Sequence, residues 1–331
     1  MAEQRFMVDF KIEPSEQTIN YTDGILLTGS CFTEHIGNHL ADLKFNVLQN
    51  PNGILFDPVS VADSLVAYTR PNAYSNIDLF HLNDVWQSWQ HHSRLSGTNR
   101  EEVWNAIQQS HHKAYEFLKN ARWLVITLGT AFCFRLKETN ATVANCHKAP
   151  ANLFRRHLLS IEEINSALDN CLHQLFHFNN KLQVIFTVSP VRHIRDGLVD
   201  NNRSKARLIE VVHHLVNKFD RLHYFPAYEL VIDVLRDYRF FDVDMVHPNY
   251  QATSFVTEKF LSAFVEKKAY ELSKQVQELV TSARHRSFHP NTPSHQRFLQ
   301  HLIEKINELA RHHPYLDFSQ EENLVRQQLN Q

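Results

Sequence analysis

Three short apolar runs separated by amphipathic stretches constrain this chain more than any other feature. The runs occupy Gly24–Thr28, Trp123–Leu128 and Leu182–Val188, and each has the length and flanks of a buried strand. The stretches between them place apolar residues at helical spacing. Strands that alternate with helices predict a mostly parallel sheet covered by helices on both faces. We therefore expect an α/β fold.

The helical stretches are bounded by spacing and capping signals. We expect helices over Thr33–Leu43, Pro58–Tyr68, Glu101–Asn120 with an Asn99 cap, Ile161–Phe176 and Asn202–Phe219.

After His247 the pattern changes to long helical segments. The first carries Phe255, Phe260 and Phe264, the second carries Phe298, Leu302, Ile306 and Leu309, and Arg284–Pro293 reads as a linker between them. We expect a main domain over residues 1–265 and a helical extension over 266–331 whose polar end, beyond Pro314, frays. The extension is expected to pack on the main domain, and joining two subunits as a homo-oligomer is the alternative.

Composition excludes several classes of protein. The chain has 331 residues, is 43% hydrophobic and carries a formal charge of −2, which favours a globular protein over a nucleic-acid or anionic-membrane binder. No stretch approaches the roughly 20 apolar residues of a membrane span, and the N-terminus lacks the apolar run of a signal peptide, so we expect a cytoplasmic protein. The four cysteines show no C-x-x-C spacing, and no glycine-rich phosphate loop occurs. We expect neither metal nor cofactor.

Gly29-Ser30 stands where the first strand should end. In open parallel sheets functional groups gather beyond the carboxyl ends of the strands. Gly29 allows a tight turn, and the following helix directs backbone N–H groups at the same point. An isolated Gly-Ser is more often a simple helix N-cap than a nucleophile.

A second segment of the sequence favours a catalytic role for Ser30. Asp244-Met-Val-His247 lies just before the helical tail, and one loop can direct both side chains toward one point. His247 could accept the proton of Ser30, while Asp244 orients the imidazole. The three residues together predict a catalytic triad.

The segment Gly29-Ser-Cys-Phe-Thr33 resembles the motif that gives the GSCFA family its name, a family related to the SGNH (GDSL-type) hydrolases. Further segments match that family in order over roughly residues 1–265. They are Asn50–Pro58, Thr127–Thr130, Val143–Lys148, Ser189–His193, Asp196–Lys205, Tyr238–Phe241 and Asp244–Pro248.

The resemblance implies a three-layer α/β/α, SGNH-hydrolase-like fold in which Ser30 attacks an ester carbonyl and Asp244 and His247 complete the triad. It also implies an oxyanion hole built from the N–H of Ser30, a glycine, for which Gly53 is the candidate, and an asparagine. The third family block reads Gly129-Thr-Ala-Phe132 and lacks that asparagine. Thr130 or Asn52 is expected to supply the missing donor.

Other residues near these segments have two interpretations each. Cys31 is the alternative nucleophile, because a thiolate at a helix N-terminus is activated, or else a small buried residue. His35 and His39 are four apart, but without the glutamate of a His-Glu-x-x-His site we expect packing rather than metal binding. Arg203 and Lys205 are expected on a solvated helix start. Six residues are candidate substrate ligands or structural side chains: His92, Arg94, His147, Lys148, Arg192 and His193.

These residues predict a cofactor-independent serine esterase or deacetylase that removes small acyl groups from a carbohydrate or related metabolite. The carbohydrate part rests on analogy with related families. An acyltransferase would use the same triad. A non-catalytic binding protein that keeps the sheet and the pocket is the alternative from another class, and the missing asparagine favours it.

Overall fold

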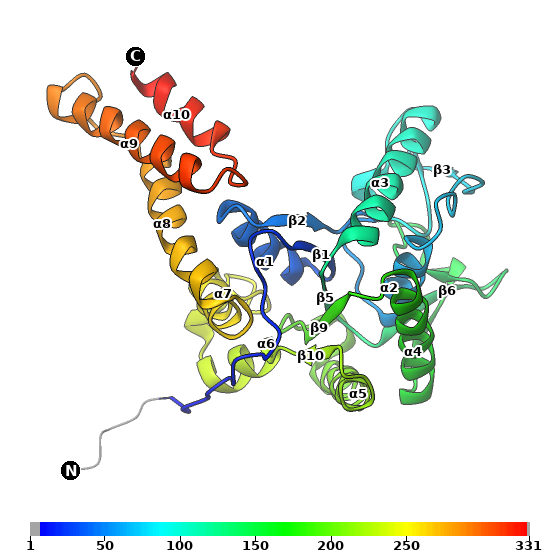
Figure 1. Ribbon diagram of the computed structural model, residues 1–331. Coiled ribbons are helices and arrows are strands. Elements are labelled where there is room, and N and C mark those ends of the chain that lie inside the picture. The colour runs from blue at the N-terminus through cyan, green and yellow to red at the C-terminus, as the bar shows by residue number, and fades with distance from the viewer. Residues whose placement is uncertain (1–6, 330–331) are drawn as a thin grey trace, which may run out of the picture. The chain divides into compact units, whose positions relative to one another are not determined.

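The computed structural model describes residues 7–329 and has a five-stranded sheet at its centre (Figure 1). The strands are β1 (Gly24–Gly29), β2 (Asn46–Gln49), β5 (Trp123–Leu128), β9 (Gln183–Val188) and β10 (Leu222–Tyr224). Their order is β10-β9-β5-β1-β2, and β1, β5, β9 and β10 pair in parallel. Every residue of β1, β5 and β9 is buried, which explains why their sequences are continuous apolar runs. The predicted α/β fold and its three strands are confirmed.

The order of the strands places the end of β1 at a special position. From β1 the chain passes through α1 (Cys31–Asp42) to β2 on one side, and the later strands extend the sheet on the other side. Because such crossovers are right-handed, α1 covers the face opposite to α4 (Ile161–Phe178) and α5 (Leu198–Lys218), as Figure 1 shows. The carboxyl end of β1 therefore lies where the winding reverses, the usual place for a ligand in such sheets.

One large core cluster joins the sheet to the helices on the α4 side, where α2 (Pro58–Ala67) and α3 (Arg100–Asn120) contribute with α4 and α5. The predicted cap of α3 is present, since Asn99 Oδ1 accepts the N–H groups of Glu101 and Glu102. Helix α4 begins with a capping box between Ser160 and Glu163. These local signals explain why the predicted helix bounds lie within a few residues of the observed ones.

Several short strands and turns lie outside the five-stranded sheet. The hairpin β3 (Phe80–Leu82) and β4 (Val85–Gln87) turns at Asn83 and Asp84, which both have the positive φ that a two-residue hairpin loop requires. The other small elements are β6 (Phe132–Leu136), β7 (Thr142–Val143) and β8 (Phe154–Leu158), which form an antiparallel sheet, 3₁₀ turns at Ser93–Leu95, Ala151–Leu153, Ile194–Asp196 and Tyr238–Phe240, α6 (Ala227–Glu229) and a π-helix over Leu230–Leu235.

The chain forms two compact units that are not consecutive in sequence. The larger contains Gly24–Gly37 and Val47–Lys259 with the segment up to Glu13, and the smaller contains Pro14–Asp23, Asn38–Asn46 and Phe260–Gln331. The long helices near the C-terminus are α7 (Tyr250–Phe264), α8 (Lys267–Arg284), α9 (Pro293–His312) and α10 (Ser319–Leu329).

Two details of the smaller unit differ from the sequence-based expectation. The first helical segment is broken into α7 and α8 at Val265, which forms a β-bridge with Ile19. The residues beyond Pro314 were expected to fray but form α10, because Leu316, Phe318 and Val325 are buried. Within residues 7–329, no helix is both long and apolar enough to cross a membrane.

Candidate active site

The turn after β1 accepts only glycine at position 29. Gly29 has φ +134°, and a Cβ there would lie 2.1 Å from the carbonyl oxygen of Thr127. Three hydrogen bonds fix the turn: Gly29 N–H donates to Asn50 Oδ1 (3.0 Å), Leu55 N–H donates to the Gly29 carbonyl (2.9 Å), and Ser30 N–H donates to the Thr127 carbonyl (3.0 Å). The backbone of Ser30 is thus held by three neighbouring segments.

Ser30 does not act as the helix cap that an isolated Gly-Ser most often forms. The N–H of Thr33 bonds to the Ser30 carbonyl (2.9 Å), and Oγ of Ser30 has no hydrogen-bond partner among residues 7–329 although the side chain is buried. The hydroxyls of Thr28, Thr33 and Thr127 are also buried and unpaired, so Ser30 is distinguished by its place at the end of β1 and the start of α1. Helix α1 begins at Cys31, and its N-terminal N–H groups favour negative charge at this point.

The loop before α7 holds Asp244 and His247 in a fixed pair. Asp244 Oδ2 lies 2.6 Å from His247 Nδ1, and Asp244 Oδ1 accepts the N–H groups of Val246 and His247, both at 3.0 Å. These backbone hydrogen bonds, and then the imidazole, lower the pKa of Asp244 to about 2. A carboxylate on Nδ1 leaves Nε2 of His247 to accept a proton, as a triad base requires.

The His247 loop lies at the carboxyl end of the sheet, because Phe241 forms a β-bridge with Pro248 and contacts Arg192, which follows β9 closely. Burial first, and then Lys205 and His247, lower the pKa of His193 to about 4, and the pKa of His35 on α1 is lowered by desolvation and by His247. His247 therefore belongs to the same end of the sheet as Ser30. No hydrogen bond joins Ser30 Oγ to His247 in this structure. Of the three residues predicted to form a triad, Asp244 and His247 are paired, and Ser30 Oγ is bonded to neither of them.

Lys205 corrects a sequence-based expectation. Arg203 is exposed and pairs with Asp200 (2.9 Å), as expected of a solvated helix start, but Lys205 is only 1% exposed. Its Nζ donates to the carbonyls of Gly129 and Ser189, each at 2.6 Å, and these residues directly follow β5 and β9. The expectation failed because α5 begins earlier than predicted and Lys205 lies on its inner face.

The four residues expected to form the oxyanion hole have other partners in this structure. Ser30 N–H is bonded to Thr127, and Gly53 N–H donates to the Asn50 carbonyl (2.7 Å). Asn52 is buried, and its amide donates to Tyr74 Oη (2.8 Å) and the Gln90 carbonyl (3.4 Å) while accepting from Tyr68 Oη. As placed, Asn52 supplies no hydrogen to an oxyanion.

Thr130, the second candidate for the missing donor, is also engaged. Its N–H donates to the Phe56 carbonyl (3.1 Å), and its hydroxyl lies 3.1 Å from Ser204 Oγ and accepts the N–H of Phe132. An oxyanion hole built from these groups therefore requires at least one of their present hydrogen bonds to break.

The predicted substrate ligands divide into two groups. Arg94 makes a two-pronged ion pair with Glu34 (2.8 and 3.2 Å), and His92 Nδ1 accepts the Arg94 N–H, so both already have partners. His147 is buried with Nε2 2.7 Å from the Ser88 carbonyl and Nδ1 3.1 Å from Ser93 Oγ, which makes a ligand role unsuited to its geometry. Its neighbour Lys148 is exposed.

The second group lies beside the Asp244–His247 loop. The guanidinium of Arg192 stacks 5.0 Å from the ring of Phe241 and 6.0 Å from that of Tyr238. His193 packs edge-on against Phe56 and donates its N–H to Asn201 Oδ1 (3.0 Å). Arg192 and His193 are thus the predicted ligands that the fold brings toward His247.

The remaining alternatives can be compared with the geometry. The thiol of Cys31 has its pKa raised, mainly by burial and against the effect of Lys205, so it lacks the activation of a nucleophilic cysteine. His35 and His39 share no third ligand, since the described residues contain no group of three His, Cys, Asp or Glu that could hold a metal.

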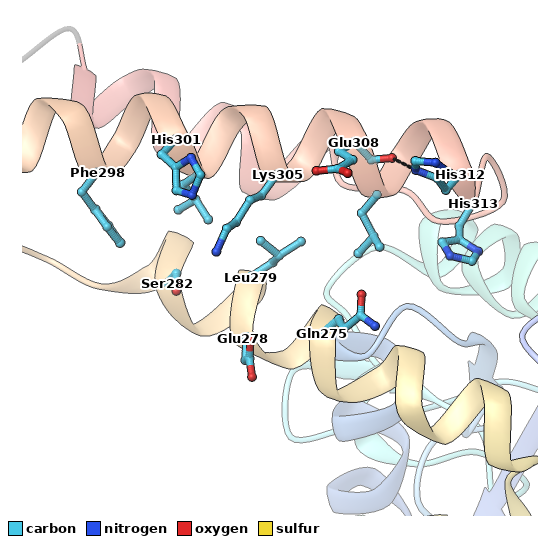
Figure 2. Close-up of a pocket in the computed structure, with 12 residues that line it drawn as sticks. Gln275, Glu278, Leu279, Ser282, Phe298, His301, Lys305, Glu308, His312 and His313 are labelled. Atoms are coloured by element: carbon cyan, nitrogen blue, oxygen red, sulfur yellow. Dashed lines mark hydrogen bonds between the residues drawn. The ribbon is translucent and has the colours of Figure 1, made fainter.

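A cavity of about 440 Å³ lies between α8 and α9 in the smaller unit (Figure 2). Phe298 and Leu279 contribute its apolar part, and His301 and Lys305 its polar part. None of the predicted catalytic residues lines it.

Two residues of the site were not singled out by sequence reasoning. Asn50 pins Gly29 and has a positive φ of 44°, for which its residue type was a weak signal. Lys205 had a clearer signal, because it falls on the buried stripe of α5. That stripe contains Asn201, Ser204, Lys205, Leu208, Val211, Val212 and Leu215. A lysine at such a position indicates a buried cation with a specific partner.

Comparison with known proteins gives family matches over most of the chain. A model described as the GSCFA family matches residues 24–260, and one described as the GSCFA domain protein, C-terminal domain, matches residues 276–331. No curated protein matches the chain. Two similar solved structures are a carbohydrate esterase family 3 protein from Talaromyces cellulolyticus and an acetyl xylan esterase, Est2A, from the rumen bacterium Butyrivibrio proteoclasticus.

Both structures are distant. The first is 9% identical, with 76% of this chain and 99% of that chain covered at a TM-score of 0.38. The second is 10% identical, with 74% and 64% covered at a TM-score of 0.36.

Proposed function

This chain belongs to the GSCFA family, and on that premise we propose that it is a serine esterase that forms an acyl-enzyme on Ser30. The observation that carries the proposal is the turn after β1. A glycine in a conformation closed to other residues presents a buried serine hydroxyl with no partner at the start of a helix. A serine that capped α1 would accept a helix N–H, and Ser30 Oγ accepts none from the described residues.

The chemistry follows from the paired loop residues. Ser30 Oγ bonds to the acyl carbon while its proton passes to His247 Nε2, and the carbonyl electron pair moves onto oxygen. As the tetrahedral intermediate collapses, the bond to the alcohol oxygen breaks and that oxygen takes the proton from His247. Water then repeats both steps and releases the acid. Asp244 keeps the imidazole oriented and stabilises its charged form throughout.

Catalysis requires the free protein to rearrange. Ser30 Oγ is buried and unbonded, so substrate has to displace whatever covers it, and His247 has to come within hydrogen-bond distance. Catalytic hydrogen bonds often tighten only when substrate is bound. The N-terminus of α1 supplies a favourable field for the oxyanion, and freeing the Ser30 N–H from Thr127 would add a direct donor.

The proposed substrate is a small acyl ester, such as an acetyl ester, of a carbohydrate or related metabolite. Arg192 and His193 beside the His247 loop are the groups that would contact the alcohol part. Transfer of the acyl group to a second alcohol in place of water would use the same residues, and product analysis with added methanol separates the two reactions.

Covalent labelling with a fluorophosphonate tests the proposal. Wild-type protein should be labelled on Ser30, as located by peptide mass spectrometry, and should hydrolyse p-nitrophenyl acetate. Ser30→Ala should abolish both, whereas the adjacent control Cys31→Ala should keep both.

Two outcomes would contradict the proposal. Labelling at Cys31 that survives in Ser30→Ala would make the cysteine the nucleophile. Absence of labelling and of turnover in folded wild-type protein would favour a binding protein of the same fold, which the engaged oxyanion donors would then explain.

A further inference from the structure

Lys205 is a cation enclosed at the end of the sheet where Ser30 lies. It projects from the second turn of α5, and its Nζ donates to the carbonyls of Gly129 and Ser189 at 2.6 Å each. Ser189 N–H is itself bonded to the Leu128 carbonyl (2.9 Å), so the two carbonyls stand side by side at the ends of β5 and β9. Ser30 holds the equivalent place after β1, the strand next to β5.

The surroundings of Lys205 do not satisfy its charge. Its side chain is almost entirely inaccessible, and none of the described carboxylates forms an ion pair with it. An ammonium has three hydrogens, and only two have acceptors within the described part of the chain. An unpaired buried charge is costly, and proteins retain one mainly where it has a function.

Two titratable groups face Lys205 from the elements around it. The thiol of Cys31 on α1 interacts with it electrostatically, and so does His193 from the loop after β9. Burial lowers the pKa of Lys205 to about 7, and Cys31 opposes that effect. Lys205 Nζ bonds to the Gly129 carbonyl at the end of β5, and Ser30 stands at the end of β1, the strand paired with β5, so the amine lies near the Ser30 turn.

We propose that Lys205 is a positioning residue of the Ser30 site, whose ammonium is fixed by the ends of β5 and β9 so that it favours the negative charge formed during acyl transfer. The inference rests on the proposed function. Lys205 transfers no proton in this scheme. It binds the Gly129 and Ser189 carbonyls, whose oxygens would otherwise repel an oxyanion. Its positive charge also stabilises the oxyanion, which the predicted oxyanion-hole donors do not do while they are bonded elsewhere.

Substitutions separate the charge from the hydrogen bonds. Lys205→Gln keeps two N–H donors for the two carbonyls but removes the charge, and Lys205→Met removes both. With p-nitrophenyl acetate, kcat of Lys205→Gln should fall about ten- to hundredfold with KM changed less than twofold. Lys218→Met, on the exposed end of the same helix, is the matched control and should leave both values unchanged. A folded Lys205→Gln with wild-type kcat would overturn the inference.

A measurement on wild-type protein covers the case in which neither Lys205 variant folds. The Nζ resonance of Lys205 is followed by NMR in ¹⁵N-lysine-labelled protein as pH is varied, before and after an anionic phosphonate adduct forms on Ser30. The adduct should raise the pKa of Lys205 by about one unit or more, because an opposite charge nearby favours the ammonium. An unchanged pKa would overturn the inference while Ser30 chemistry stands. No Ser30-dependent reaction in wild-type protein would remove the proposed function and this inference together.

Discussion

Replacing Gly29 with alanine should damage the fold and the proposed nucleophile at once. The new Cβ would lie 2.1 Å from the Thr127 carbonyl oxygen and 2.8 Å from its carbon, where real Cβ atoms essentially never come under 3.0 Å. Relief needs a backbone shift of about 1 Å, since van der Waals contact begins well beyond 3 Å. That shift would break the 3.0 Å hydrogen bond from Ser30 N–H to the same carbonyl.

Two costs add in this variant. A non-glycine residue at φ +134° stores about 1–3 kcal/mol of backbone strain, and overpacking against fixed backbone costs about 1–3 kcal/mol more. We therefore expect the free energy of unfolding to fall by about 2–6 kcal/mol, measured by urea unfolding followed by circular dichroism. Fluorophosphonate labelling of Ser30 should be lost even where the variant is fully folded.

Gly197 provides the matched control. It also has a positive φ, +78°, but a Cβ there would have no atom within 4 Å. Gly197→Ala should therefore lose only the torsional part, about 1–3 kcal/mol, and keep labelling. If both variants lost the same free energy, or if Gly29→Ala were labelled like wild type, the steric account of the nucleophile turn would be wrong.

Three further predictions concern the base, the core and the buried histidines. Asp244→Asn should lower kcat by about 10³–10⁴ by leaving His247 in the wrong tautomer, and a loss below tenfold would contradict that role. Because the pKa of Asp244 is about 2, Asp244 should stay ionised throughout the pH range of the assay. Leu168→Ala, in the core stripe of α4, should lower the free energy of unfolding by about 2–5 kcal/mol in urea, and a loss below 1 kcal/mol would show that neighbouring side chains fill the cavity. Burial lowers the pKa of His91 to about 3, below its unfolded value of about 6.5, so its contribution to stability is full above pH 6.5 and is lost as pH falls toward 3. Stability measured from pH 7 to 4 should fall less steeply in His91→Asn, and an equal slope would show that His91 is already protonated.

The sequence was sufficient for the strands and for the start of α3 because each has a local signal. The buried runs match β1, β5 and β9, and Asn99 marks the start of α3 with its own side chain. Helix α10 was missed because its polar composition hides the few apolar residues, such as Val325, that are buried in the smaller unit. Its stability comes from tertiary packing, which periodicity over a short polar segment does not reveal.

The oxyanion donors could not be judged from sequence for a related reason. Whether Asn52 has a hydrogen to offer depends on Tyr74 Oη and the Gln90 carbonyl, which come from distant parts of the chain. Lys205 was misjudged because lysine is usually solvated, although its place on the inner face of α5 was readable. Its residue type predicted an exposed side chain and its position on the helix predicted a buried one, and the position was right.

The Asp244–His247 pair is encoded almost entirely by its own loop. One carboxylate closes the turn through two backbone N–H groups and orients the ring, while Asp242 N–H bonds to the His247 carbonyl (2.8 Å). Such a segment is portable: grafted between two fixed anchors in another scaffold, it should bring its histidine geometry with it. Ser30 has no such independence, because its turn depends on Asn50, Leu55 and Thr127 at once. An engineer could therefore move the Asp244–His247 pair between proteins, but would have to build a sheet to obtain the Ser30 turn.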